Sequence, residues 1–541
     1  MTAPSKYRRA AAILLRRYAM ALAQWAIIAG LGAIAACGFR PLALWPAMLL
    51  GVAGLVFLIG RQASARNAAL VGWLWGVGHF TLGNNWIATA FTYQAKMPTW
   101  LGLLAVVALA FYLAVYPALA ALAAWLLNRR LGAALVPAFA GVWVVAEWLR
   151  AWVFTGFAWN PLGVALLGDF AHPGLAVLAP WMGSYGLSAV AVVLAGMVGA
   201  GLVHILRPAG NRLRGAVLVA VPVVLLGGAM VWPAPQQAAG HIPYTLVQPN
   251  IAQADLDDPS HYEEQFLRTA QLSLARQPDQ RRLLLWPESG VPDYLREGYP
   301  REIYEATTFA GDAWLARMRL ARVAGAGGTL LTGSVDLDMA RGRVMGARNV
   351  VTVLDDQGRI TASYAKAHLV PYGEYLPMRG LLEPLGLARL VPGSIDFLSG
   401  PGPRTLDLKD MGKVGVQICY EIIFSGQVIE RTRRPDFLFN PSNDGWFGEW
   451  GPPQHLAQAR LRAIEEGVPV LRATTNGISA VVDARGVVRQ FAPRDRAMRL
   501  DGLVPPAHAP TPFARLGNML ALLWATVLVV VSVVATRRRA G

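Results

Sequence analysis

Long apolar runs are the feature that most constrains this chain, because a polypeptide with so many of them must fold largely inside a lipid bilayer. Hydrophobic residues make up 55% of the 541 positions and charged residues only 15%. A helix needs about 20 consecutive apolar residues to cross the hydrocarbon core of a membrane. We therefore predict a polytopic α-helical membrane protein with eight spans, at residues 18–37, 42–60, 67–88, 100–127, 132–153, 186–206, 214–232 and 518–536.

The basic residues decide the predicted orientation. A net charge of +16 is common among proteins that bind nucleic acid, but here the basic residues gather at the ends of the apolar runs, so we expect no nucleic acid partner. Because loops rich in Lys and Arg stay in the cytoplasm, both termini are predicted to be cytoplasmic and the segment between the last two spans to lie outside. The residues behind this argument are Lys6, Arg8, Arg9, Arg16, Arg17, Arg61, Arg66, Arg129, Arg130, Arg207, Arg212, Arg214 and Arg537 to Arg539.

Composition divides the chain into three predicted parts. Residues 1–239 form a membrane domain with spans one to seven, residues 240–505 have the composition of a soluble domain, and residues 506–541 hold the final span and a basic cytoplasmic tail. The alternation of short apolar strands with helical stretches predicts that the middle part is an extracytoplasmic α/β domain with α-β-β-α layers. The predicted helices are 261–277 and 452–467, and the predicted strands are 244–250, 282–288, 329–337, 348–355, 414–421, 436–443 and 478–486.

Cys419 is the candidate nucleophile of the middle part. The chain has two cysteines, and the other, Cys37, lies in the first predicted span, so we expect no disulfide between them. Free cysteines often only fill space in a core. A thiol that stays unpaired outside the cytoplasm is at risk of oxidation, however, and this favours a functional reason for its presence. A nucleophilic thiol needs a base to take its proton and a cation to hold developing negative charge.

Two charged residues upstream can supply these parts. Glu288 follows an apolar strand in LLLWPES, where an unpaired buried carboxylate would be costly, although a solvated loop residue is the alternative. Lys366 lies among aromatic residues in SYAKAHLVPYGEYLP, although most lysines are solvated surface charges. We expect Glu374, in the same segment, either to pair with Lys366 and orient it or to assist proton transfer.

A glutamate after a strand, then a lysine, then a cysteine followed by Tyr420 and Glu421 resembles the nitrilase, or carbon-nitrogen hydrolase, superfamily, whose members use a Glu-Lys-Cys triad. Together with the spans, the chain resembles the apolipoprotein N-acyltransferase family over nearly its whole length. The motifs that carry this resemblance are WPE, KAHLVPYGEYLP, GVQICYE, NPSNDGWFG, QHLAQARLRAIEEGVPVLRATTNGISAV and TPFARLGN, with GHFTLGNNWI and EWLRAWVFTGFAW in the membrane half.

The resemblance implies an enzyme of the bacterial inner membrane whose catalytic domain is periplasmic. Such an enzyme transfers an acyl chain from a phospholipid, typically phosphatidylethanolamine, to the N-terminal diacylglyceryl-cysteine of a lipoprotein, and it needs no cofactor or metal. The implied catalytic roles are nucleophile for Cys419, which would carry the acyl chain as a thioester, general base for Glu288 and oxyanion stabilisation for Lys366. Supporting roles are implied for Glu374, Tyr420 and Glu421.

Two further groups of residues have candidate roles. Trp446, Phe447 and Trp450 in NDGWFGEW are interpreted as a mobile loop that binds and encloses acyl chains, with packing in the core as the alternative. Glu147 and Arg150 interrupt the fifth span three residues apart on one helix face, and we expect them to form a structural pair.

Two other classes of protein remain open. A membrane-tethered amidase would use the same triad to hydrolyse a carbon-nitrogen bond, but it needs only an anchor, which eight spans do not favour. A transporter with an extracytoplasmic ligand-binding domain would carry charged residues along several spans and a pair of broken helices, and we find neither pattern in the sequence.

Overall fold

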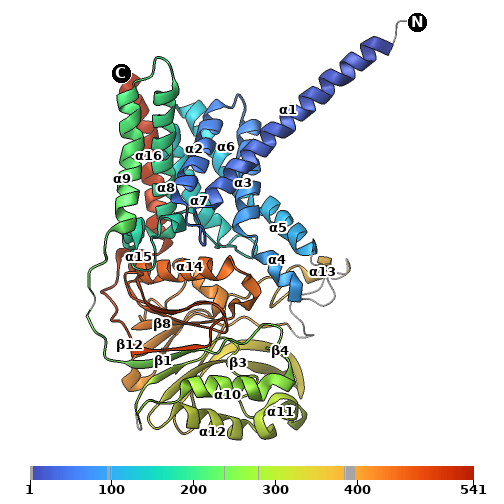
Figure 1. Ribbon diagram of the computed structural model, residues 1–541, viewed down its shortest axis with the longest axis vertical. Coiled ribbons are helices and arrows are strands. Elements are labelled where there is room, and N and C mark those ends of the chain that lie inside the picture. The colour runs from blue at the N-terminus through green and yellow to red at the C-terminus, as the bar shows by residue number, and fades with distance from the viewer. Residues whose placement is uncertain are drawn as a thin grey trace.

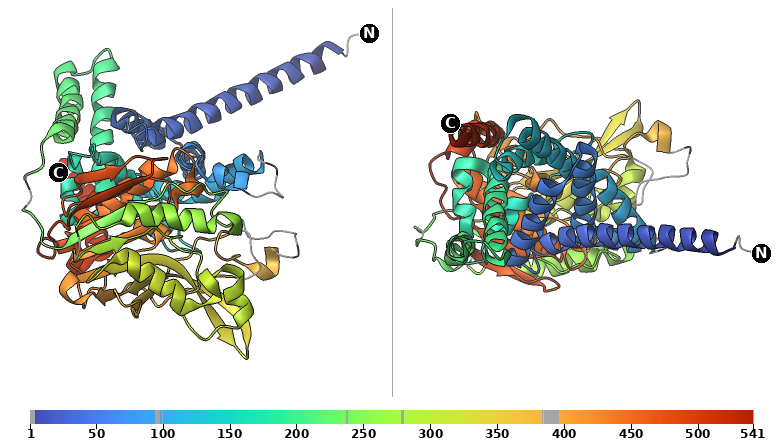
Figure 2. Two further views of the ribbon diagram at one scale, coloured as in Figure 1. Left: turned by 60° about the horizontal axis from the view of Figure 1, so that its bottom comes forward. Right: turned by 90° about the horizontal axis from the view of Figure 1, so that it is seen from above.

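The computed structural model describes residues 4–93, 98, 100–236, 238–277, 280–382, 384 and 396–540. A bundle of long helices forms one half of the molecule and stacked β-sheets form the other, with helix α14 (Gly451–Glu466) between them (Figure 1). The N-terminal helix α1 (Pro4–Ala36) runs obliquely away from the bundle, as both views in Figure 2 also show. The C-terminus lies at the end of the bundle that is far from the sheets.

Each predicted span contains a helix. By length and composition, five helices among the described residues can cross a membrane, namely those within Ala11–Ala36, Trp100–Leu131, Gly174–Leu206, Arg212–Val231 and Asn518–Thr536. Two others, α2 and α7, have only 17 and 16 residues. The count of eight spans therefore stays a prediction. The bounds after α1 are α2 Trp45–Arg61, α3 Ala65–Gly83, α4 Ile87–Ala90, α5 Trp100–Leu113, α6 Val115–Leu131, α7 Leu135–Arg150, α8 Ala179–Leu206, α9 Arg212–Val231 and α16 Asn518–Ala540.

Glu147 and Arg150 are both buried near the end of α7, but the expected direct pair is not what holds them. Glu147 Oε1 accepts a hydrogen bond of 2.7 Å from the backbone N–H of Leu162. Arg150 Nη1 donates to the carbonyl oxygens of Phe157 and Trp159, at 2.9 and 2.8 Å. Within the described residues, both side chains thus bind the backbone of the loop after α7 rather than each other, because a buried loop needs partners for its peptide groups.

Two β-sheets of six strands each stack face to face among the described residues. The first has the order β12-β1-β2-β3-β4-β5 and the second β11-β10-β9-β8-β7-β6, with parallel pairing at the centre of each. Their bounds are β1 Pro243–Gln248, β2 Leu283–Leu285, β3 Thr329–Ala340, β4 Arg343–Leu354, β5 Ile360–Ala365, β6 Thr405–Asp407, β7 Lys413–Val416, β8 Phe437–Ser442, β9 Val470–Thr474, β10 Ser479–Val482, β11 Val488–Ala492 and β12 Met498–Leu503.

Helices cover the outer faces of the two sheets and complete the predicted α-β-β-α layers. Trp286 after β2 packs with Leu320 of α12 (Ala313–Ala324), and α10 (Tyr262–Ser273) lies beside α12 on the same face. Helix α14 covers the second sheet. Strands β8 and β9 are buried along their whole length because the first sheet lies on one side and α14 on the other.

Helix α14 is buried on all sides because its second face contacts the membrane half. Arg460 donates to the carbonyl oxygens of Gly486 at 2.7 Å and of Gly168, in the loop before α8, at 2.9 Å. Glu465 Oε1 accepts a hydrogen bond of 2.6 Å from the N–H of Ser184. The polar face of α14, which in a soluble domain would meet water, therefore attaches the sheets to the helix bundle.

Candidate active site

Glu288, Lys366 and Cys419 each follow a strand. Glu288 comes three residues after β2 ends, Lys366 directly follows β5, and Cys419 begins the short 3-10 helix η8 (Cys419–Ile423) after β7. The first two strands belong to the first sheet and β7 to the second. Strand ends from both sheets thus bring together residues that are far apart in the sequence, as expected of open α/β sheets.

Lys366 lies at the centre of a group of carboxylates. Its Nζ is 3.1 Å from Glu288 Oε1 and 2.9 Å from Glu374 Oε1. Burial alone would lower the pKa of Lys366, but the charges of Glu288 and Glu374 outweigh burial and hold this pKa above its ordinary value. Lys366 therefore stays a cation, which is what an oxyanion stabiliser requires. Of the two roles expected for Glu374, the contact fits pairing and orientation.

Glu288 is held by two further contacts. Asn349 Nδ2 donates to Glu288 Oε1 at 2.8 Å and is 3.2 Å from Glu374 Oε1. The backbone N–H of Asn443 donates to Glu288 Oε2 at 2.9 Å. The carboxylate is therefore fixed through both oxygens, and its side chain keeps only 10% of its surface exposed.

The thiol of Cys419 is 5% exposed and shares this site. Burial, followed by the negative charge of Glu288, raises the pKa of Cys419, while Lys366 acts in the opposite direction. The resting thiol is therefore protonated, so its reaction needs a base at hand. Cys419 has a φ of 49°, a left-handed conformation that residues with a side chain adopt rarely and that is frequent at functional sites.

Glu421 connects the segments that follow Lys366 and Cys419. Its Oε1 accepts hydrogen bonds from Tyr364 Oη at 2.8 Å and from the N–H of Ala367 at 2.7 Å, and its Oε2 accepts one from the N–H of Ile418 at 2.7 Å. Burial raises the pKa of Glu421 to about 7 despite these donors. The arrangement ties the two loops of the site together. These contacts fit the supporting role expected for Glu421.

The aromatic candidates and Tyr420 face the membrane half. Phe447 is buried, with ring centroids 4.8 Å from Trp86 and 5.6 Å from Trp159. Tyr420 Oη donates to the carbonyl of Gly156 at 3.4 Å. Phe447 therefore takes the packing role that was the alternative to enclosing acyl chains. Trp446 and Trp450 are only partly buried.

Several residues of the site were not singled out from the sequence. Asn349 and Asn443 contact Glu288, and Tyr364 contacts Glu421. Asn349 left a signal, because it is an amide near the start of the apolar strand RNVVTVLD, and a polar side chain that is even half-buried there needs a partner. The N–H of Asn443 left none, since every residue except proline has one.

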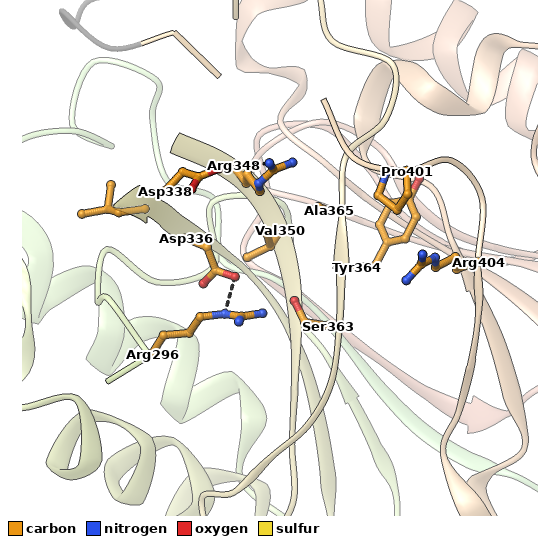
Figure 3. A pocket seen from close by; sticks show the side chains of 11 residues that line it. Arg296, Asp336, Asp338, Arg348, Val350, Ser363, Tyr364, Ala365, Pro401 and Arg404 are labelled. Carbon is orange, nitrogen blue, oxygen red and sulfur yellow. Dashed lines mark hydrogen bonds and ion pairs between the residues drawn. The ribbon is translucent and has the colours of Figure 1, made fainter. Parts of the chain in front are cut away.

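A cavity of about 360 Å³ lies against strands β3, β4 and β5, on the face opposite to the one from which Asn349 contacts Glu288 (Figure 3). Five of its eleven lining residues are charged, among them Arg296, whose Nε donates to Asp336 Oδ2 at 2.6 Å. Glu288, Lys366 and Cys419 do not line it. In the part of the chain that the structure describes, no group of three or more His, Cys, Asp or Glu side chains is placed to hold a metal ion.

Comparison with known proteins gives the class and then the family. A carbon-nitrogen hydrolase family model matches residues 244–497, so the sheets and their strand-end site belong to an enzyme domain of that superfamily. The model of the apolipoprotein N-acyltransferase N-terminal domain matches residues 31–197. The apolipoprotein N-acyltransferase of Rhodopseudomonas palustris is 33% identical, covering 94% of both chains, and that of Bradyrhizobium diazoefficiens is 33% identical, covering 100% of this chain and 99% of its own. The chain belongs to the apolipoprotein N-acyltransferase family and is a membrane enzyme.

Two of the solved structures that are similar to this chain each match about half of it. An amidase from Nesterenkonia sp. is 19% identical and covers 50% of this chain and 92% of its own, with a TM-score of 0.31. A carbon-nitrogen hydrolase from Helicobacter pylori is 16% identical and covers 48% of this chain and 88% of its own, with a TM-score of 0.34.

Proposed function

We propose that this enzyme N-acylates the diacylglyceryl-cysteine at the N-terminus of lipoproteins, with a membrane phospholipid, phosphatidylethanolamine in the first instance, as acyl donor. The observation that carries the proposal is the contact of 3.1 Å between Lys366 Nζ and Glu288 Oε1 beside the buried thiol of Cys419. This contact supports the proposed roles of Glu288 as base and Lys366 as cation at one nucleophile. The attached helix bundle lets lipid substrates reach that nucleophile from the membrane. The family of the chain supports both the acyl transfer and the lipid substrates.

In the first half of the reaction, the Glu288 carboxylate takes the proton from the Cys419 thiol and the sulfur attacks the ester carbonyl of the phospholipid. Lys366, together with the N–H after Cys419, stabilises the oxyanion of the tetrahedral intermediate. The bond between the carbonyl carbon and the glycerol oxygen breaks, and this oxygen leaves with the proton from Glu288. A lysophospholipid and a thioester on Cys419 result.

In the second half, the α-amino group of the lipoprotein attacks the thioester carbonyl. Glu288 takes a proton from this amine, the carbon-sulfur bond breaks, and the thiolate of Cys419 recovers a proton from Glu288. An amide-linked acyl chain leaves on the lipoprotein. The two halves share one nucleophile, so ping-pong kinetics are expected. Neither half needs a metal or a diffusible cofactor.

The proposed setting is the bacterial inner membrane, with both termini in the cytoplasm and residues 240–505 as a periplasmic catalytic domain. The alternation of basic loops supports this orientation. Alkaline phosphatase inserted at the exposed β3–β4 turn, at Arg341, tests it, because this reporter is active only outside the cytoplasm. An inactive phosphatase at Arg341, together with an active one after the C-terminus, would show that the orientation is the opposite of the proposed one.

The mechanism is tested with purified enzyme and phosphatidylethanolamine labelled in one acyl chain. Mass spectrometry is expected to find the labelled chain on the peptide that contains Cys419, and addition of a diacylated lipopeptide is expected to remove it. Cys419→Ala should form no adduct, and Glu288→Gln should form it far more slowly. An adduct that persists in Cys419→Ala would refute the mechanism. Release of free fatty acid, without transfer to the lipopeptide, would favour a hydrolase.

A further inference from the structure

The carbonyl oxygen of Cys419 is anchored by helix α14. His455 Nε2 lies 3.0 Å from this oxygen, and the next side-chain donor, Asn440 Nδ2, is more distant at 3.5 Å. His455 is fully buried. Because the left-handed backbone of Cys419 is intrinsically unfavourable, its surroundings must hold it in place. The hydrogen bond from His455 is the strongest side-chain contact that does so.

Two buried side chains determine which nitrogen of His455 carries the hydrogen. Arg472 Nη2 lies 3.0 Å and Asp444 Oδ1 3.2 Å from His455 Nδ1, so this nitrogen accepts from the arginine when the ring is neutral and donates to the carboxylate only when the ring is protonated. A carbonyl oxygen only accepts, so the Nε2 that faces the Cys419 carbonyl carries a hydrogen in both forms. The hydrogen of the neutral ring is then on Nε2, which donates to Cys419. Asp444 holds Arg472 in turn, with both carboxylate oxygens 2.7 and 2.8 Å from the same Nη2. Burial and the charge of Arg472 lower the pKa of His455, so the ring stays neutral.

Because the Cys419 carbonyl is held by His455, the direction of the N–H in the same peptide unit is also fixed. A trans peptide is planar, so the carbonyl of one residue and the N–H of the next point to opposite sides. The Cys419 carbonyl points to His455, and the Tyr420 N–H therefore points away from α14. This N–H lies in the first turn of η8, where helical N–H groups have no partner within the helix. In the described residues no acceptor for it is found.

We propose that His455 is a positioning residue, which by holding the Cys419 carbonyl aims the Tyr420 N–H at the oxyanion that forms when Cys419 is acylated. Asp444 and Arg472 serve the same end because they fix the tautomer of His455. His455 itself touches neither the substrate nor the reacting sulfur. The inference rests on the proposed function, since it requires an acyl transfer through Cys419.

The test compares two reactions of the same thiol. Acylation by the phospholipid passes through an oxyanion and so needs the aimed N–H. Alkylation by iodoacetamide forms a carbon-sulfur bond and releases iodide, with no oxyanion, so it needs only an accessible thiolate. Both are followed on the peptide that contains Cys419 by mass spectrometry, for wild type, His455→Leu and His455→Gln. The Gln amide can donate from nearly the position of Nε2, whereas Leu cannot donate. His241→Leu, which alters an exposed loop histidine, is the matched control.

We expect His455→Leu to slow acylation about 10- to 100-fold, short of the ~10²–10³-fold loss that follows removal of an oxyanion donor. Alkylation should change less than about threefold, and His455→Gln should recover most of the acylation rate. Equal losses in both reactions would mean that His455 only keeps the site folded and would overturn the proposal. So would unchanged acylation in His455→Leu, or an equal loss in His455→Gln. If wild type forms no acyl adduct on Cys419, the proposed function fails instead.

Discussion

Lys366 and Glu374 are joined by a hydrogen bond of 2.9 Å between Nζ and Oε1, and the second oxygen of Glu374 accepts one of 2.7 Å from the N–H of Val370. Glu374 thereby ties the ammonium group to the loop that follows it. The sequence allowed two roles for this carboxylate, and the contact fits the orienting one. Its contribution can be measured separately from that of Glu288.

Replacement of Glu374 by Gln keeps the shape of the side chain and removes its charge. Hydrogen bonds to charged groups contribute about 1.5–3 kcal/mol, so we expect acylation of Cys419 to slow by roughly 10- to 100-fold if the whole effect is felt in the transition state. The rate of acyl adduct formation measures it. Glu297→Gln, which changes a carboxylate with 70% of its surface exposed, serves as control and should react like wild type. A wild-type rate in Glu374→Gln would show that Glu288 alone is enough to orient Lys366.

Arg460 attaches the sheets to the helix bundle. Its Nε and Nη1 donate to the carbonyls of Gly486 and Gly168 in two directions. A lysine cannot span both, so Arg460→Lys leaves a buried carbonyl without a donor and should destabilise the protein by at least about 1–3 kcal/mol. Thermal unfolding in detergent is the measurement. Arg268→Lys, at an exposed pair with Glu264, should change stability by less than about 1 kcal/mol. Similar melting temperatures for the two variants would contradict this role of Arg460.

Some of the observed strands were predicted from the sequence and others were missed, and the difference has a physical reason. Strand β8 was predicted because it begins with the apolar run Phe437–Phe439, and the structure buries it along its whole length. Strand β9 (VLRAT) was missed, because Arg472 in its middle breaks the apolar pattern. That arginine is fully buried, and its charge is compensated by Asp444, 28 residues away in the chain. A pairing between residues so far apart leaves no periodic signal in the sequence.

The residues of the site likewise divide into those that the sequence indicates and those that only the structure reveals. Glu288, Lys366 and Cys419 could be proposed from the sequence because each has an unusual residue type for its local setting. The role of His455 could not, because it depends on a contact between helix α14 and the residue after β7 that only the packed layers bring about. Asn349 left a signal as a polar residue in a strand, but its partner Glu288 follows β2, which lies two strands away in the same sheet. Helix α14 was predicted correctly as a helix, yet its pattern of polar and apolar residues gave no sign that the polar face would meet membrane loops instead of water.

Glu466, at the end of α14, should make stability depend on pH. Burial, followed by the charge of Glu465, raises its pKa from the ordinary value of 4.5 to about 8. The folded state therefore keeps a proton on Glu466 over a pH range in which the unfolded state has lost it. This contribution to stability is complete below about pH 4.5, declines as the pH rises to about 8, and is constant above that.

Glu466→Gln carries no charge at any pH and should lose this dependence. We expect its melting temperature, relative to wild type, to rise between about pH 5 and about pH 8 and to level off above that. Glu264→Gln, at an exposed position, corrects for changes shared by the whole protein. A constant difference between Glu466→Gln and wild type over this range would show that Glu466 is already ionised in the folded protein at pH 5.

In the aromatic segment after β8, we expect Phe447 to serve packing and Trp446 to be available to substrate. Phe447 is buried against Trp86 and Trp159, so Phe447→Ala leaves a cavity and should destabilise the protein by about 3–5 kcal/mol. Trp446 is only partly buried, and its ring centroid lies 5.6 Å from that of Tyr93 in an edge-to-face arrangement. Trp446→Ala should therefore have a much smaller effect on the melting temperature.

If acyl chains bind along this segment, Trp446→Ala should instead raise the KM for phospholipid several-fold with little change in kcat, because a contact made equally in the ground and transition states affects binding alone. Phe447→Ala, by contrast, should lower the melting temperature and weaken both halves of the reaction. Steady-state kinetics with phospholipid and lipopeptide, combined with thermal unfolding, distinguish the two. An unchanged KM in Trp446→Ala, at wild-type stability, would remove Trp446 from the acyl site and shift the search to the membrane helices themselves.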